Sequence, residues 1–288
     1  MRRSMRVVGT VVGSVAAVTA GALAVGALVW NRATARAVAR LDAEPARSGT
    51  GVAPTRFSPD ELVGLPAPVV RYFEFALTPG QPLVRHARLT QQGTFAMRRD
   101  AWAPFTAVED FAVWPPGFVW DAKIRMAPGV VARVRDSYLA GEGVMQGKAA
   151  ALVTVVDHRG TPEMAASSLL RYLAEAAWLP TALLPSAGVR WEAVDDSTAR
   201  ATLADAGTAV RMDVHFAASG EIARISADRH RDVNGTPVLT PWEGHFWDYQ
   251  RASGMTVPMS SEVGWILSDG WFPYWRGRTV KAEYATVA

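Results

Sequence analysis

Residues 160–191, GTPEMAASSLLRYLAEAAWLPTALLPSAGVRW, carry the strongest helical signal beyond the N-terminus, and strand-like sequence lies on both sides of them. Thr161 supplies an N-cap oxygen and Pro162 suits the first helical turn. Apolar and small residues then recur at helical spacing until Pro180 ends the pattern. We therefore predict a helix over residues 162–178 that covers a large antiparallel sheet.

The sequence before and after this helix alternates between apolar and polar residues with a period of two. The alternation extends from Pro82 to Val156 and again from Thr198 to Tyr284. One apolar face and one wet face per strand are typical of an antiparallel sheet. With about eleven or twelve strands, the pattern predicts an α+β, mainly antiparallel β fold, in which a large curved sheet, half-barrel or barrel-like, is covered by one main helix. A second, short helix is expected at residues 69–77.

Two turn sequences, Ala206-Gly207 and Ser219-Gly220, allow the strand register to be predicted. The pairs expected across these hairpins are Arg200 with Asp213, Leu203 with Val210, Val214 with Ile225 and Phe216 with Ala223. These registers place apolar residues opposite apolar residues and opposite charges across from each other. We therefore expect a meander from about residue 198 to residue 233.

Residues 7–31 contain no charged side chain and are bracketed by Arg6 and Arg32. Roughly 20 apolar residues span a bilayer core, so the segment is long enough for a transmembrane helix, with Trp30 at the membrane interface. The alternative is a cleaved signal peptide, with a cleavage site among the small residues 20–24. A short N-terminus with clustered Arg usually stays in the cytoplasm, which predicts a membrane-anchored protein whose main domain is extracytoplasmic.

The composition divides the chain into three parts: residues 1–31 as a transmembrane anchor or signal, 32–56 as a linker, and 57–288 as a single β-rich domain. The first 47 residues hold seven Arg and two acidic residues, whereas the rest holds 23 Lys or Arg against 25 Asp or Glu. The main domain therefore has no basic stripe of the kind that binds nucleic acid. The chain has no Cys, its five His are scattered, and no spacing motif indicates a metal or cofactor site.

Several short strings occur together in a way that resembles a known family. They are LPAPVVRYF at 65–73, PPGFVWD at 115–121, RDSY at 135–138, GTPE at 160–163, RYLAE at 171–175, TPWEG at 240–244 and PYWRG at 273–277. The set is similar to an uncharacterised bacterial domain-of-unknown-function family over roughly residues 60–286. That resemblance implies no activity and no catalytic residues. In architecture, many strands wrapping a helix resemble the periplasmic lipoprotein-carrier fold, although a fold does not determine a function.

Three polar side chains, Gln91, Glu109 and Asp136, fall on otherwise apolar strand faces. A buried polar group without a partner is costly, so each must find a partner or change its protonation. One interpretation is an interior site in which Glu109 and Asp136 act as acid and base. The other is a structural hydrogen-bonded cluster that includes Tyr138 or an Arg. The predicted ligand-binding residues are Gln91, Glu109, Trp120, Asp136, Tyr138 and Tyr172.

Three functional hypotheses follow from the sequence. The first is a domain that binds an apolar or lipid-like ligand between curved sheet and helix, which requires a pocket of at least roughly 300 Å³. The second is a hydrolase or isomerase that uses Glu109 and Asp136. The third is a scaffold protein that docks a partner through the aromatic stretch 271–275. The sequence leaves open whether the protein is an enzyme.

Overall fold

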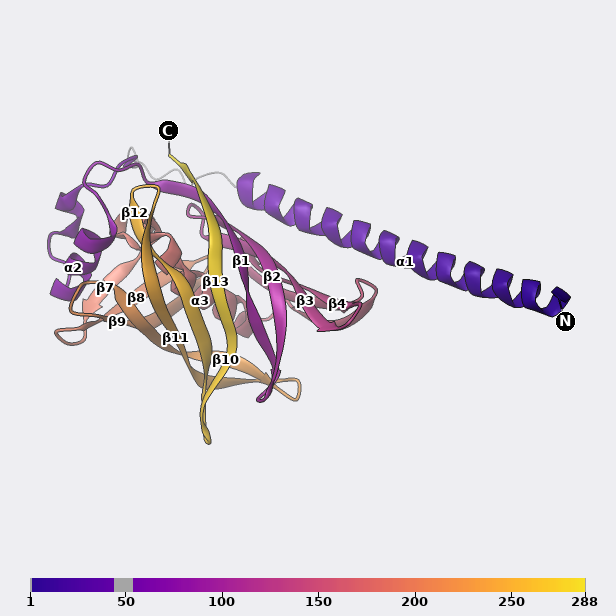
Figure 1. Ribbon diagram of the computed structural model, residues 1–288. Helices are drawn as coiled ribbons and strands as arrows, with labels where there is room; N and C mark the ends of the chain where they lie inside the picture. The colour runs from indigo at the N-terminus through magenta and orange to yellow at the C-terminus, as the bar shows by residue number, and fades with distance from the viewer. Residues whose placement is uncertain (1, 44–53, 288) are drawn as a thin grey trace.

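In the described part of the chain, thirteen antiparallel strands form one open sheet that curves around a central helix (Figure 1). The computed structural model describes residues 2–43 and 54–287, with side chains for residues 21–43 and 54–287. The strands are β1 Val84–Arg98, β2 Ala101–Ala112, β3 Gly117–Ala127, β4 Val130–Leu139, β5 Glu142–Ala149, β6 Val153–Arg159, β7 Arg190–Ala193, β8 Thr198–Asp205, β9 Thr208–Phe216, β10 Ile222–Val233, β11 Thr236–Ala252, β12 Met255–Leu267 and β13 Gly270–Thr286. The mainly antiparallel architecture with a covering helix is confirmed.

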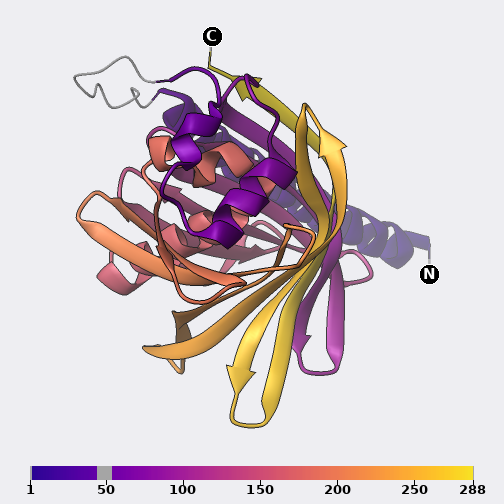
Figure 2. The ribbon, with the colours of Figure 1, turned by 90° about the vertical axis from the view of Figure 1, so that its left-hand side faces the viewer.

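The strand order explains why a helix covers one face of the sheet. Strands β1 to β6 form one meander and β7 to β13 form another, and the two are joined where β1 pairs with β13. The chain therefore leaves β6 at one edge and must reach β7 at the opposite edge. Helix α3, Pro162–Glu175, makes this crossing and contacts strands of both meanders (Figure 2). Because the edge strands β6 and β7 do not pair with each other, the sheet does not close into a barrel.

Helix α3 begins where its sequence predicts, but its α-helical part ends at Glu175 rather than at residue 178. The Thr161 hydroxyl accepts a hydrogen bond from the backbone N–H of Met164 at 3.2 Å, which satisfies one of the free amide groups of the first turn. The helix continues into a 3-10 turn, Ala176–Trp178, and short 3-10 helices follow at Pro180–Leu183 and Pro185–Ala187. Leu169 and Leu173 are fully buried in the single hydrophobic core.

One glycine sets how closely α3 approaches the sheet. A Cβ atom on Gly143 of β5 would lie 2.4 Å from the carbonyl oxygen of Met164 and 2.7 Å from the hydroxyl oxygen of Ser168, both in α3. Only a residue without a side chain allows this contact between helix backbone and strand. By contrast, a Cβ on the buried Gly147 of the same strand would meet only the side chains of Val155 and Val156, at 3.3 Å or more.

The register predictions hold for one hairpin and partly for the other. In β8 and β9, Arg200 lies opposite Asp213 and Leu203 opposite Val210, and the guanidinium of Arg200 forms an ion pair with Asp213 at 2.7 Å. In β9 and β10, Val214 lies opposite Ile225 as expected. The pairing of Phe216 with Ala223 is wrong, because a register shift between Ile222 and Arg224 places Ile222 opposite Phe216.

The apolar–polar alternation in the sequence does not predict two of the observed strands. The structure has thirteen strands where about eleven or twelve were expected, and β5 and β7 were not predicted. Strand β5 contains Gly143 and Gly147 among polar residues, so the period of two is lost. Strand β7 is only four residues long. The short helix expected at residues 69–77 is present as α2, Ala67–Ala76, and a Ser58-capped 3-10 helix, Pro59–Leu62, precedes it.

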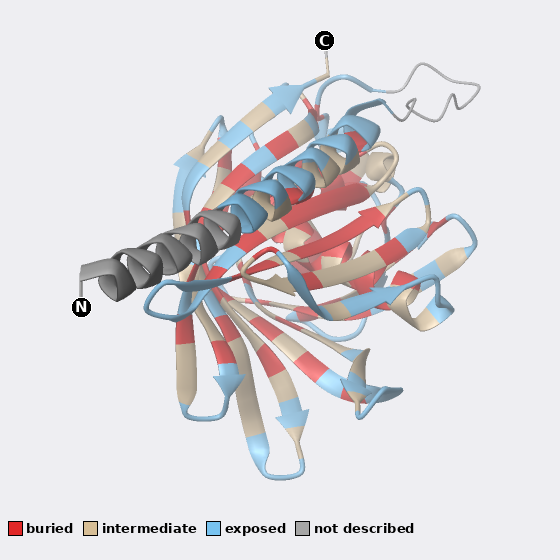
Figure 3. Ribbon diagram, turned by 90° about the vertical axis from the view of Figure 1, so that its right-hand side faces the viewer, coloured by how far each residue is buried: buried red, intermediate tan, exposed pale blue. Residues whose placement is uncertain are grey.

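The C-terminal part of the N-terminal helix α1 (Arg2–Ala43) lies against the face of the sheet opposite α3 (Figure 3). Trp30 is buried there, and its indole N–H donates a hydrogen bond to Asp121 of β3 at 2.9 Å. The guanidinium groups of Arg133 and Arg135 in β4 lie 5.7 and 4.9 Å from the Trp30 ring. The expectation that Trp30 sits at a membrane interface is therefore wrong, because cations and a carboxylate of the domain bind it instead.

Within the residues whose side chains are described, no helix is both long and apolar enough to cross a membrane. The predicted span, residues 7–31, falls largely outside that part of the chain, since side chains are described only from residue 21. The linker predicted at 32–56 is helical as far as Ala43, and residues 44–53 lie outside the described part.

We predict that Gly143→Ala lowers the free energy of unfolding by about 1–3 kcal/mol, because the added methyl group forces α3 away from β5. Chemical denaturation followed by far-UV circular dichroism measures the change. Gly147→Ala on the same strand is the matched control and is expected to cost less. Equal losses in the two variants would contradict the close helix–strand contact.

Candidate functional site

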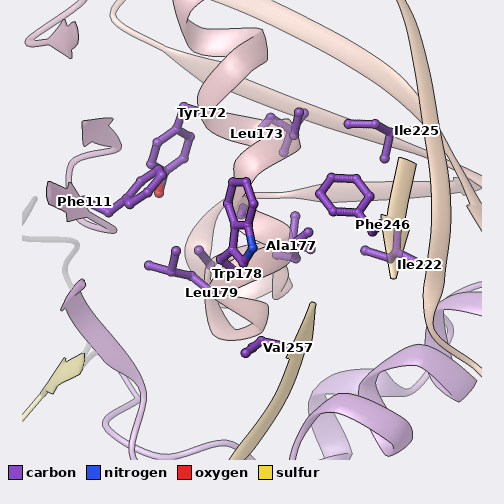
Figure 4. Packing of buried hydrophobic residues seen from close by; sticks show 14 of the residues in the cluster. Phe111, Tyr172, Leu173, Ala177, Trp178, Leu179, Ile222, Ile225, Phe246 and Val257 are labelled. Carbon is purple, nitrogen blue, oxygen red and sulfur yellow. The ribbon is translucent and has the colours of Figure 1, made fainter. Parts of the chain in front are cut away.

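A cavity of about 550 Å³ lies between α3 and the concave face of the sheet. It is bordered by α3 and the 3-10 turn that follows it, and by strands of both meanders. Its aromatic and apolar lining consists of Phe95, Trp120, Met145, Met164, Ala174, Trp178, Pro237, Trp242, Phe246, Val263, Trp265, Tyr274 and Trp275. Figure 4 shows Trp178 below α3 with Phe246 beside it, and their ring centroids are 6.0 Å apart. The cavity is therefore an aromatic-rich space of the size that binds small molecules.

Arg171 of α3 joins the helix to the sheet beside this cavity. Its guanidinium donates three hydrogen bonds: Nη1 to Asp136 Oδ2 at 2.7 Å, Nη2 to Glu109 Oε1 at 3.0 Å, and Nε to Glu175 Oε1 at 2.9 Å. The same guanidinium lies 4.8 Å from the Phe118 ring centroid. Charge-assisted hydrogen bonds of this kind are stronger than neutral ones.

Gln91 extends this network into the sheet. Its amide nitrogen donates to Glu109 Oε2 at 3.0 Å, and its amide oxygen accepts from the indole N–H of Trp120 at 2.9 Å. Four of the six predicted ligand-binding residues, Gln91, Glu109, Trp120 and Asp136, thus belong to one connected cluster. Trp120 and Asp136 line the cavity, whereas Gln91 and Glu109 lie behind it.

Burial raises the pKa of two of the three carboxyl groups around the Arg171 guanidinium, those of Glu109 and Glu175. Burial raises the pKa of Glu109 well above its usual range, the neighbouring Glu175 raises it further, and Arg171 and Gln91 oppose the rise. Burial also raises the pKa of Glu175, but Arg171 and a hydrogen bond with Glu109 lower it. The pKa of Glu109 is the more strongly raised of the two, so burial favours the protonated form of Glu109 most.

The two predicted tyrosines lie away from the cavity. The Tyr138 hydroxyl donates to Asp205 Oδ2 at 2.9 Å, and the Tyr172 ring packs 6.2 Å from that of Phe111. Neither residue contributes to the lining. The geometry therefore does not support the predicted ligand-binding roles of Tyr138 and Tyr172. Both are buried core residues.

Sequence reasoning missed the centre of the site. Arg171, Glu175 and Trp178 were not among the predicted site residues. The available signal was that three polar residues on apolar faces need a cation, and the covering helix supplies only one arginine, Arg171. The helical spacing of Arg171 and Glu175, four residues apart, also indicates a shared face.

The geometry limits the chemistry of the site. Glu109 and Asp136 bind the same guanidinium, but the Glu109 side chain is 0% exposed, so it does not reach the cavity. An acid–base pair must contact the reacting atoms, which Glu109 cannot do here. Within the described residues, no group of three or more His, Asp or Glu side chains is arranged to hold a metal ion.

Comparison with known proteins gives a family but no activity. A family model described as "Family of unknown function (DUF6920)" matches residues 63–284. No curated protein matches the chain. Among solved structures, the LolA superfamily protein NE2245 from Nitrosomonas europaea matches at a TM-score of 0.39 and 8% sequence identity, covering 77% of this chain and 94% of that protein.

We predict that Glu109→Gln changes how stability depends on pH. A group whose pKa is raised by folding stabilises the protein below its unfolded pKa and loses that contribution as the pH rises through its folded pKa. Relative to the variant, the wild-type protein should lose at least about 1 kcal/mol of unfolding free energy between pH 4.5 and 8. Urea denaturation at a series of pH values measures this difference.

Glu283→Gln, at an exposed position of β13, is the control and should follow the wild-type profile. A difference between wild type and Glu109→Gln that is independent of pH would contradict a protonated Glu109.

Proposed function

The chain belongs to the family of unknown function that its residues 63–284 match, and from the geometry of its cavity we propose that the main domain binds an apolar, lipid-like ligand between the sheet and α3. The observation that carries this proposal is the cavity of about 550 Å³ lined by five tryptophans and further apolar side chains. Its volume falls within the range of roughly 300–1,000 Å³ that is typical of ligand pockets.

The energetics favour an elongated apolar ligand. Each buried methylene group contributes about 0.8 kcal/mol, so a chain of several methylene groups in this cavity would bind appreciably. Aromatic side chains such as Trp178 and Trp275 provide large rigid contact surfaces, and their ring centroids are 6.5 Å apart. A well-packed core would instead fill this space with side chains.

The two alternative functions receive less support from the geometry. A hydrolase or isomerase that uses Glu109 and Asp136 would need both carboxyl groups at the surface of the cavity. The side chain of Glu109 is fully buried and does not line the cavity. A docking patch at residues 271–275 would need those aromatic rings at the surface. Trp275 is only 8% exposed and lines the cavity together with Tyr274, and the indole N–H of Trp271 donates to Glu262.

We also propose that the N-terminal segment anchors this domain in a membrane, with the domain on the extracytoplasmic side. Residues 7–25 contain no charged residue and would span about 28 Å as a helix, close to the thickness of a bilayer core. From Gly26 onward α1 is held by the domain, because a Cβ on Gly26 would lie 2.7 Å from the carbonyl oxygen of Ala151. Leu23 and Val25 are exposed apolar residues that a membrane would cover.

We predict that filling the cavity abolishes ligand binding. Val263→Trp adds a large ring to the lining and should weaken binding of the neutral apolar dye N-phenyl-1-naphthylamine at least about tenfold. Dye fluorescence titration measures the affinity. Val280→Trp, at a strand position that is 47% exposed, is the matched control and should bind as the wild type does. Equal affinity in the wild type and in Val263→Trp, or no binding to either, would refute the proposal.

The location is tested separately. An alkaline phosphatase fusion placed after Arg56 should be active, because that enzyme requires an oxidising compartment. A β-galactosidase fusion at the same position should be inactive. The reverse pair of results would place the domain in the cytoplasm.

A further inference from the structure

The cavity has two chemically different ends. Helix α3 runs along it, so Thr161 and Glu163 mark one end, and Arg171, Glu175 and Trp178 mark the other. At a rise of 1.5 Å per residue, Thr161 and Arg171 are about 15 Å apart along the helix. We call these the rim, near Thr161, and the inner end, near Arg171. The polar group of an amphipathic ligand would bind at one of these two ends.

The rim already has most of its charges paired. Arg159 binds Asp157, and His158 lies 4.0 Å from Asp232. Arg229 donates to the Tyr274 hydroxyl at 3.1 Å and lies over the Trp242 ring. Counting Arg231 and Glu163 as well, the rim holds three arginines and three acidic residues, so their formal charges sum to zero; the Nε atoms of Arg229 and Arg231 have no hydrogen-bond partner among the described residues.

The inner end has buried polar atoms without partners. Asp136 is 5% exposed and its Oδ1 has no hydrogen-bond partner among the described residues. The same holds for the indole N–H of Trp178, which is 3% exposed, and for the hydroxyl of Ser261, which is 1% exposed. All three residues line the cavity. Buried polar groups are almost always hydrogen-bonded, so these atoms indicate a missing polar partner.

The types of these atoms restrict that partner. A carboxylate oxygen only accepts hydrogen bonds, an indole N–H only donates, and a hydroxyl does both. The ammonium group of a ligand would form hydrogen bonds only with the acceptor atoms of the protein. A ligand carboxylate or phosphate would form them only with the donor groups of the protein. A carboxylate or phosphate would also lie beside the carboxylate of Asp136, which is already bound to Arg171.

On these grounds, and resting on the proposed ligand-binding function, we propose that the ligand is an uncharged lipid alcohol whose hydroxyl group donates a hydrogen bond to Asp136 at the inner end of the cavity. The hydroxyl oxygen remains free to accept a hydrogen bond from the protein. The apolar chain then extends along α3 among the tryptophans toward the rim.

A matched ligand series tests this inference on the full-length protein. Dodecan-1-ol, dodecanoate, dodecylamine and dodecyl phosphate share one chain and differ in the polar group, and each is titrated against bound N-phenyl-1-naphthylamine. Dodecan-1-ol should bind at least about tenfold more tightly than each of the other three ligands. Its hydroxyl group donates a hydrogen bond to the carboxylate of Asp136, whereas each of the other polar groups leaves donors or acceptors of the protein unpaired.

Two variants locate the effect. Asp136→Asn should reduce the preference for the alcohol over dodecanoate to less than about threefold, because it removes the repelling charge and weakens the acceptor. Glu175→Gln should also reduce the preference for the alcohol over dodecanoate. This second variant provides the test if Asp136→Asn does not fold. Glu283→Gln removes a carboxylate at an exposed position outside the cavity instead, and it should keep the wild-type preference.

The outcomes separate this inference from the proposed function. If the series binds but dodecanoate, dodecylamine or dodecyl phosphate equals or exceeds the alcohol, the lipid-alcohol assignment is wrong while apolar binding stands. A preference that Asp136→Asn and Glu175→Gln both leave unchanged also overturns it. If neither the dye nor any ligand of the series binds, the proposed function fails and this inference fails with it.

Discussion

The guanidinium of Arg171 connects the two parts of the fold that define the cavity. It is the point at which the crossing helix binds strands β2 and β4, through Glu109 and Asp136. A buried guanidinium loses its hydration, and only several well-placed acceptors compensate for that loss. The surrounding sequence supplies three carboxyl groups and, through Gln91, a link to Trp120. The site is therefore polar on one side and aromatic on the other.

The connectivity of the sheet makes such a site possible. Because the two meanders end at opposite edges, the chain must cross the concave face once, and that crossing covers the face that would otherwise be exposed. Gly143 lets α3 approach β5 closely at one end of the crossing. Farther along, large rings such as Trp178 and Trp275 meet, and rigid rings of this size do not fill the space completely. The cavity extends under the helix from Met164, beside the contact with Gly143, to Trp178.

Much of the fold could be predicted from the sequence because local patterns determine it. The Thr161 cap, the helix that follows, and the Arg200–Asp213 register all depend on residues close in the chain. What failed depends on contacts between distant residues. The bulge opposite Phe216 leaves no local signature, and Trp30 is buried by arginines about a hundred positions away.

The site divides in the same way. Gln91, Glu109 and Asp136 could be found because each breaks an apolar alternation, which is a local signal. Their common partner, Arg171, lies in another element, and only the fold shows which arginine reaches all of them. Trp178 has no distinguishing sequence feature, since any tryptophan in an apolar segment looks like a core residue. Tyr138 and Tyr172 were also predicted as site residues, but they contact only other residues of the core. A polar atom on a buried side chain is therefore not by itself a sign of a binding site.

The most direct test of the account is native mass spectrometry of the full-length protein extracted in mild detergent. We expect a population whose mass exceeds that of the polypeptide by one lipid molecule, and dissociation of this population should release an uncharged apolar compound. A spectrum that contains only the bare polypeptide, from protein extracted and kept under non-denaturing conditions, would contradict the claim that the space between α3 and the sheet is a ligand site.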